Sequence, residues 1–275
     1  MSVFAEYDYR MTRRVRYGEG APVHARIAQV LAAGSTAYAA TARDIDAYAD
    51  DLHKIAVHAD PERPTEPHWA NSFLPGLDIA TLYAMVAARK PAIYCEIGSG
   101  HSTRVAALAK RMHSPQTRIV SIDPSPRADV AGLCDDVVRA PLQDCDLSIF
   151  AQLRAGDFLF LDGSHQVLQN SDVSVFFLEV LPMLAPGVIV QIHDMCWPAD
   201  YPSAWLGRMY SEQYMLGMLL IYAPKRVKLI AANGWISLQE RQPSPADVIW
   251  SDPALIAAGI APRGSSFWFM LQPAR

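Results

Sequence analysis

Acidic and imidazole side chains follow two apolar runs of this chain, 158–161 and 188–192. Four such side chains come directly after these runs: Asp162, His165, His193 and Asp194. Grouped in one crevice, they suit a divalent metal, since carboxylates favour Mg²⁺ and imidazoles accept Mn²⁺, Zn²⁺ or Fe²⁺. They equally suit general-base chemistry, in which a histidine takes a proton from a substrate hydroxyl. Both uses stay open: catalysis by His165, His193 and Asp162, and metal binding by Asp162, His193 and Asp194.

A glycine-containing segment, 92–103, suits a nucleoside-containing cofactor. It reads Ala-Ile-Tyr-Cys-Glu-Ile-Gly-Ser-Gly-His-Ser-Thr, an apolar run followed by a tight turn and a helix-forming stretch. Gly98 and Gly100 allow the backbone to approach a ligand, and the helix that follows offers free N–H groups. The next apolar run ends in Asp123, 23 residues beyond Gly100. An acid at this place suits the paired hydroxyls of a ribose.

The residues around this turn also indicate which cofactor is excluded. A dinucleotide fingerprint has a third glycine, but this position is Thr103. Glu96 precedes the first glycine by two residues, where its carboxylate would repel a pyrophosphate and attract an ammonium group. We expect Leu142, Gln143 and Asp144, which follow a third apolar run, to flank an adenine. The predicted cofactor-binding residues are Glu96, Gly98, Ser99, Gly100, Ser102, Asp123, Pro124, Leu142, Asp144 and Asp162.

The elements that must position these residues alternate along the chain. Apolar runs predict strands at 92–96, 118–122, 136–139, 157–162 and 187–192. Helical spacing predicts helices at 102–112, 127–133, 146–153 and 171–184. Such alternation predicts a doubly wound α/β fold with a mostly parallel sheet, in which ligands lie outside the carboxyl ends of the strands. The four acidic and imidazole side chains should therefore meet beside the reactive end of the cofactor.

The two ends of the chain extend this central unit. Residues 24–57 read as helix, broken at Gly34 and Ser35, and four prolines mark a loop over 58–76. We expect residues 1–76 to be a helical extension and lid, with Trp69, Asn71 and Phe73 folding over the site, and residues 77–275 to be the cofactor-binding domain. A helix at 213–222, a strand at 226–231, an insertion loop at 242–262 and a last strand at 265–271 complete it. Aromatics at 197–205 read equally as a lid or as core.

Composition excludes several classes of protein. With 51% hydrophobic and 19% charged residues and a net charge of −4, the 275-residue chain can form a substantial core and does not resemble a nucleic-acid-binding protein. The basic run at 10–16 reads as a solvated segment. The four cysteines have no metal or disulfide spacing. Without a signal-like start or a long apolar stretch, we expect a cytoplasmic protein that does not bind a membrane; homo-oligomer formation stays open.

The pattern Glu-x-Gly-x-Gly-x-Ser resembles the first motif of class I S-adenosylmethionine-dependent methyltransferases. Asp-Gly-x-His at 162–165 and His-Asp at 193–194 resemble macrolide-sugar O-methyltransferases and cephalosporin-hydroxylase-like proteins. Segments 125–127, 197–202 and 212–214 resemble a bacterial subgroup of these, and the likeness spans residues 78–240. It implies a Rossmann-like, seven-stranded sheet with the last strand antiparallel, and S-adenosylmethionine as cofactor. In the metal-dependent relatives, and in catechol O-methyltransferase, acids at these strand ends bind Mg²⁺. His193 departs from that acidic pattern, which favours a histidine base.

The predicted function is methyl transfer from S-adenosylmethionine to a hydroxyl of a small molecule or sugar, and the sugar rests on family analogy alone. Two alternatives remain. One is an NAD-dependent oxidoreductase, against which Thr103 and Glu96 argue. The other is a cofactor-binding or scaffold protein without catalysis. The sequence identifies neither the methyl acceptor nor the pathway.

Overall fold

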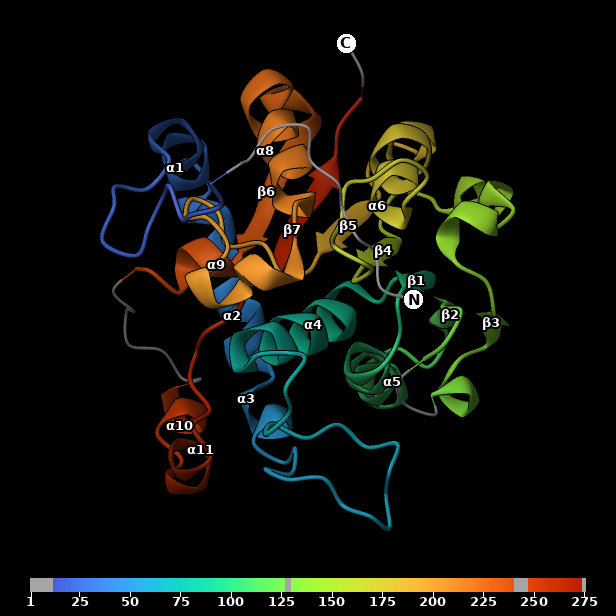
Figure 1. Ribbon diagram of the computed structural model, residues 1–275. Helices are drawn as coiled ribbons and strands as arrows, with labels where there is room; N and C mark the ends of the chain where they lie inside the picture. Colours follow the sequence, from blue (N-terminus) through green and yellow to red (C-terminus); the bar gives the residue numbers. More distant parts are fainter. Residues whose placement is uncertain (1–11, 127–129, 240–246, 274–275) are drawn as a thin grey trace.

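A seven-stranded sheet forms the centre of the molecule, with helices on both faces (Figure 1). The computed structural model describes residues 12–126, 130–239 and 247–273. The strand order is β3-β2-β1-β4-β5-β7-β6; the first five are parallel, and β7 lies antiparallel between β5 and β6. The strands are β1 Ile93–Ile97, β2 Arg118–Ile122, β3 Asp136–Val138, β4 Phe158–Leu161, β5 Ile189–Ile192, β6 Val227–Ala232 and β7 Phe267–Leu271. The predicted Rossmann-like fold with an antiparallel last strand is confirmed.

Eleven α-helices surround this sheet in the part of the chain that the structure describes. They are α1 Ala25–Ala32, α2 Ser35–Ala47, α3 Ala49–Leu52, α4 Gly76–Arg89, α5 His101–His113, α6 Asp172–Val175, α7 Leu181–Met183, α8 Glu212–Tyr222, α9 Asn233–Ile236, α10 Asp247–Trp250 and α11 Pro253–Ala257. A π-helical stretch, Phe176–Val180, joins α6 to α7, so the predicted helix at 171–184 is present with one widened turn.

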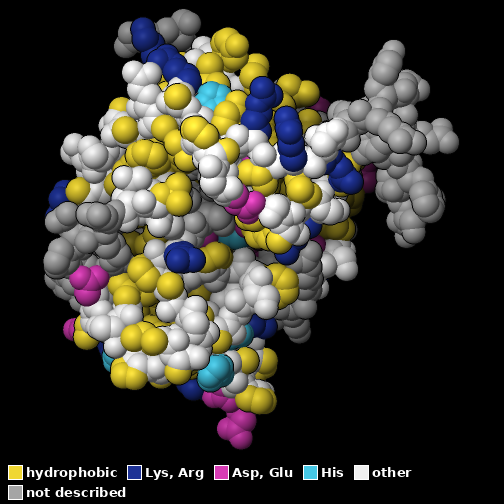
Figure 2. Space-filling model, turned by 60° about the vertical axis from the view of Figure 1, so that its left-hand side comes forward, with side chains coloured by type: hydrophobic (Ala, Val, Ile, Leu, Met, Phe, Trp, Pro, Cys, Tyr) yellow, Lys and Arg dark blue, Asp and Glu magenta, His cyan; other side chains and the backbone are white. Residues whose placement is uncertain are grey.

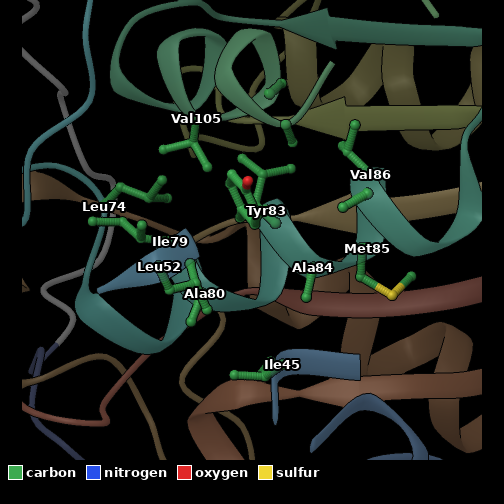
Figure 3. Close-up of a cluster of buried hydrophobic side chains, with 14 of the residues drawn as sticks. Ile45, Leu52, Leu74, Ile79, Ala80, Tyr83, Ala84, Met85, Val86 and Val105 are labelled. Atoms are coloured by element: carbon green, nitrogen blue, oxygen red, sulfur yellow. The ribbon is translucent and has the colours of Figure 1, made fainter. Parts of the chain in front are cut away.

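Two hydrophobic cores lie on opposite faces of the sheet, because successive strand residues point to opposite sides. On one face Tyr94, Phe158 and Phe160 pack with α2, α4 and α5. On the other, Cys95 and Leu159 pack with α1, α6 and α8. Figure 3 shows the first core, where side chains of α4 meet residues of α2, α3 and α5. Twelve of the fourteen residues of α4 are buried, which explains why the sequence of this helix is apolar on every side.

Several predicted elements differ from the structure. The helices predicted at 127–133 and 146–153 are 3-10 turns, Ala131–Leu133 and Leu147–Gln152; residues 127–129 lie outside the described part. The loop predicted at 242–262 was wrong in part, since it contains α10 and α11, while residues 242–246 are not described. Aspartate caps explain α11: the Asp252 side chain accepts a hydrogen bond from the Ala254 N–H, and Pro253 occupies the first helical position.

The N-terminal helices share the cores of the sheet domain. Ile45 and Leu52, from α2 and α3, belong to the core of α4, and Ile27 of α1 belongs to the opposite core with Leu216 of α8. The predicted boundary between a helical extension, residues 1–76, and a cofactor-binding domain, residues 77–275, stays a prediction. None of the helices in the described ranges is long and apolar enough to cross a membrane.

Candidate active site

A large cavity opens at the carboxyl ends of β1, β2, β4 and β5, with a volume of about 1040 Å³. Figure 2 shows this side of the molecule hollowed, with histidine and acidic side chains visible in the hollow and basic ones around it. One end of the cavity is lined by the glycine turn and Asp123, and the other by Trp205, Arg208 and Tyr210. The strand ends thus open onto a single space, as expected for an open α/β sheet.

The glycine turn closes tightly on the neighbouring strand end. Gly98 has a φ of +81°, and a Cβ there would lie 2.0 Å from the carbonyl oxygen of Asp162. Only glycine fits such a position. The carboxylate of Asp123 accepts hydrogen bonds from the Ser99 N–H (2.8 Å), the Ser99 hydroxyl (3.0 Å) and the Ser125 N–H (2.7 Å). These bonds hold Asp123 in the cavity wall, with lone pairs left for a ligand hydroxyl.

The predicted cofactor residues divide into two groups. Those in the cavity wall are Gly98, Ser99, Asp123, Pro124, Leu142 and Asp162, joined there by Gln143. Those outside the wall are Glu96, Gly100, Ser102 and Asp144. Their cofactor roles stay predictions.

Glu96 is buried behind the turn rather than in it. Its carboxylate accepts hydrogen bonds from the hydroxyls of Tyr94, Ser102 and Thr103, and its side chain has no exposed surface. Burial raises the pKa of Glu96 to about 8, against the lowering effect of these hydroxyls. The contacts tie β1 to the first turn of α5, which gives Glu96 a structural task that its sequence position did not indicate.

The imidazole of His165 lies among three carboxylates. Its Nδ1 lies 2.8 Å from Oε2 of Glu212, and its Nε2 lies 3.2 Å from Oδ1 of Asp162 and 3.7 Å from Oδ2 of Asp194. The side chain of Glu212 is fully buried, and His165 is itself 5% exposed. The backbone N–H groups of Ser211 and Glu212 both donate to the His165 carbonyl oxygen. The start of α8 is thereby fastened to the loop after β4.

His193 has a similar setting on the other side of the cluster. Its Nε2 lies 3.3 Å from Oδ2 of Asp78, and its Nδ1 lies 3.5 Å from Oδ1 of both Asp162 and Asp194. These separations are those of ion pairs, and none has hydrogen-bond geometry. Asp78, at the start of α4, accepts hydrogen bonds from Nδ2 of Asn233 (2.7 Å) and from two backbone N–H groups at 265 and 266.

Electrostatics within the cluster favour charged forms. Burial opposes the imidazolium form of His165, but the carboxylates of Asp162 and Glu212 outweigh it and raise the pKa of His165 well above its ordinary value. The pKa of His193 is raised in the same way, against burial, by Asp194 and Asp162. Burial also opposes ionisation of Asp162, yet the two histidines hold its pKa well below the usual range. The cluster is therefore a network of mutually stabilised charges.

Sequence reasoning missed Asp78 and Glu212. Each lies in the first turn of a helix, where an acid reads as an ordinary partner of the helix dipole. Backbone conformation gives a further signal that only the structure provides: His165 and Asp194 have positive φ values of 59° and 54°. Such conformations are uncommon for residues other than glycine and cluster at functional sites.

The two predicted carboxylate ligands, Asp162 and Asp194, lie close to both imidazoles. Across 12–126, 130–239 and 247–273, no group of three or more His, Cys, Asp or Glu side chains is arranged to hold a metal ion. Metal binding by Asp162, His193 and Asp194 stays a prediction, and no step of the chemistry proposed below passes through a metal.

The far end of the cavity is aromatic. Trp205 and Tyr210 line it, whereas Trp197 and Tyr201 are each 5% exposed and pack inside the molecule. The aromatics predicted over 197–205 therefore serve in part as core and in part as cavity wall. The expected lid residues Trp69, Asn71 and Phe73 also line the cavity.

The chain is similar to one family of known proteins and, distantly, to several solved structures. Residues 95–195 match the model of a methyltransferase domain family, while no curated protein matches the sequence. A solved O-methyltransferase of Bacillus cereus, in complex with SAH, is 17% identical (85% of this chain, 91% of that one, TM-score 0.41). The O-methyltransferase TomG of Streptomyces achromogenes, involved in tomaymycin synthesis and in complex with SAM, is 16% identical (84% and 90%, TM-score 0.39). Likeness at this level says nothing of substrate or reaction. The family match over residues 95–195 and the order of the strands agree with the predicted likeness to class I, Rossmann-like methyltransferases.

Proposed function

We propose that this protein transfers the methyl group of S-adenosylmethionine to a hydroxyl oxygen of a small molecule, with His165 as the base. The observation that carries the proposal is the single cavity that joins the glycine turn and Asp123 to the cluster of His165 and Asp162. A cofactor held at one end and a proton acceptor at the other are what methyl transfer to oxygen requires.

The residues at the first end fit S-adenosylmethionine. Asp123 faces the cavity with its carboxylate fixed by Ser99, a suitable partner for ribose hydroxyls, and Leu142 offers an apolar surface beside it for an adenine. When bound, the cofactor supplies a methyl group on a sulfonium, already activated for attack by an aligned oxygen. The role of this chain is to align that oxygen and to remove its proton.

In this proposal, His165 removes that proton through Nε2. Its Nδ1 is held by Glu212, so Nδ1–H donates to that carboxylate and Nε2 is left as the acceptor on the side of Asp162 and the cavity. As the proton arrives, the ionised carboxylates on both sides stabilise the imidazolium. The raised pKa of His165 implies that it acts as a base only at a pH high enough to make it neutral.

The oxidoreductase alternative meets an obstacle in the same turn. The Thr103 hydroxyl accepts a hydrogen bond from the Gly100 N–H at 2.9 Å, and thus occupies a donor that a pyrophosphate would need. Nothing comparable blocks the smaller, phosphate-free cofactor.

Calorimetric titration tests the cofactor. S-adenosylhomocysteine should bind, NAD should not, and Asp123→Ala should weaken binding of S-adenosylhomocysteine by about 1.5–3 kcal/mol, the scale of a hydrogen bond to a charged group. Asp50→Ala, which removes an exposed carboxylate from α3, should leave binding unchanged. Binding of NAD without binding of S-adenosylhomocysteine would refute the proposal.

A further inference from the structure

We propose that the methyl acceptor is an anionic molecule, a ring bearing a hydroxyl and a carboxylate or phosphate, whose negative group binds Arg208 and Arg263. This inference rests on the proposed function and adds the class of acceptor. Both arginines line the cavity beyond the acid–histidine cluster, and both are exposed to it from different segments of the chain.

In the part of the chain that the structure describes, the two guanidinium groups of this cavity have no acidic partner. Among the described residues, neither Arg208 nor Arg263 forms an ion pair with an acidic side chain. The carboxylates of the cavity wall, by contrast, all have donors or cations of their own. Asp172 accepts from the Ser164 N–H and hydroxyl, and Asp194 accepts from the Ser265 hydroxyl and pairs with the histidines.

The guanidinium group of Arg208 lies over two aromatic rings and has no acidic partner within the described ranges. Its Cζ lies 4.3 Å from the ring centroid of Trp205 and 5.6 Å from that of Tyr210. A guanidinium held by its face against aromatic rings still presents its planar edge, which suits two parallel hydrogen bonds to a carboxylate or phosphate. The same aromatic surface suits a planar ring of the acceptor.

Contacts through Tyr210 and Gln166 connect Arg208 to His165. Tyr210 packs on His165 with ring centroids 4.4 Å apart, and Gln166, next to His165, donates from Nε2 to the Arg208 carbonyl oxygen at 3.1 Å. Because Tyr210 lies 4.4 Å from His165 and 5.6 Å from Arg208, the guanidinium carbon is at most about 10 Å from the imidazole. An acceptor of one ring with its substituents can span that distance, with its hydroxyl at His165 and its anion at Arg208.

Arg263 lines the same cavity from the segment before β7. Its carbonyl oxygen accepts from the Leu77 N–H at the start of α4, and Ser265, two residues on, donates to Asp194. The segment before β7 is thus fastened to the cluster on the side of His193, as the segment before α8 is on the side of His165. Two such arginines would fix both the position of the anion and the direction in which the hydroxyl points.

The test is a charge series on one ring, with the protein saturated with S-adenosylhomocysteine. The probes are 3,4-dihydroxybenzoate, its neutral amide 3,4-dihydroxybenzamide and the cationic 3,4-dihydroxybenzylamine, with 4-hydroxyphenyl phosphate as the phosphate arm. We expect the benzoate or the phosphate to bind at least tenfold more tightly than the amide, and the amine to bind weakest. Arg208→Gln and Arg263→Gln should each abolish this preference, and Arg43→Gln, which removes an exposed charge from α2, should leave it intact.

The inference is overturned if neither anionic probe binds more tightly than the amide, or if the preference survives in both cavity variants. Thermal unfolding of the variants shows that they are folded. Failure of the proposed function is a separate result: it is absence of S-adenosylhomocysteine binding, whatever the charge series gives.

Discussion

Glu212→Gln should lower the pKa of His165 without moving its ring. Glu212 is fully buried and its Oε2 lies 2.8 Å from Nδ1 of His165, so its charge acts on the imidazole at close range with little screening. Glutamine has the same shape, and its amide oxygen can still accept from Nδ1–H. An opposite charge at this distance raises a pKa by about 1–3 units, so its removal should lower the pKa of His165 by that amount.

The sign follows from the charges that face His165. In the wild type, Glu212, Asp162 and Asp194 all favour the imidazolium, and the pKa of His165 lies well above its ordinary value. His165 should therefore be protonated at pH 6.5 in the wild type and lose its proton at a lower pH in the variant. Methyl transfer, which needs the neutral base, should rise with pH earlier in Glu212→Gln than in the wild type.

Histidine-labelled protein, titrated by NMR with S-adenosylhomocysteine bound, measures this directly and needs no acceptor. The signal of His165 is the one absent from His165→Asn. Glu179→Gln, at an exposed site of the π-helical stretch, is the control and should leave the titration unchanged. The reasoning is refuted if the wild-type His165 titrates at or below pH 6.5, or if Glu212→Gln titrates as the wild type does.

Two further outcomes are expected. Gly98→Ala keeps a φ of +81° and adds a methyl 2.0 Å from the Asp162 carbonyl oxygen, so backbone strain and crowding should each lower the unfolding free energy by about 1–3 kcal/mol. Gly100→Ala is the control: its methyl would meet no atom within 4 Å, so it should lower the unfolding free energy by under about 1 kcal/mol. Chemical denaturation measures both. If a metal is required, EDTA should abolish methyl transfer and Mg²⁺ or Mn²⁺ should restore it. If EDTA has no effect, the rate should fall as pH drops through the pKa of His165, which places that fall above pH 6.5.

The sheet was predictable from sequence because its signals are local. Each parallel strand is a short apolar run that ends at a polar residue or glycine, as at Gly98 and Asp123, and burial on both faces demands that pattern. The acid–histidine cluster was predictable for a related reason, because the carboxyl ends of neighbouring parallel strands lie at the same edge of the sheet. The predicted helices that failed close as short 3-10 turns, Ala131–Leu133 and Leu147–Gln152.

The acidic partners of the two histidines could not be predicted from such local signals. Asp78 and Glu212 are 115 and 47 residues from the histidines that they contact, and each resembles an ordinary acid in a helical first turn. The contacts of Glu96 were equally hidden from the sequence: its carboxylate accepts hydrogen bonds from three hydroxyls of its own chain, while its contact with the cofactor stays a prediction. Pairings across distant segments depend on tertiary packing, which one sequence does not reveal.

Tertiary packing connects the acid–histidine cluster to helices on both faces of the sheet. Asp78 comes from α4 on one face of the sheet and Glu212 from α8 on the other, and each contacts one histidine at a strand end, while Asp162 lies between the two histidines. The cluster is therefore held by helices of both layers and does not depend on the loops alone. Because Asp162 also lies against Gly98, a shift of the glycine turn on cofactor binding would reach His165 through one carboxylate. Cofactor occupancy and the proton affinity of the base should then be coupled, which the His165 titration can detect as a difference between free and S-adenosylhomocysteine-bound protein.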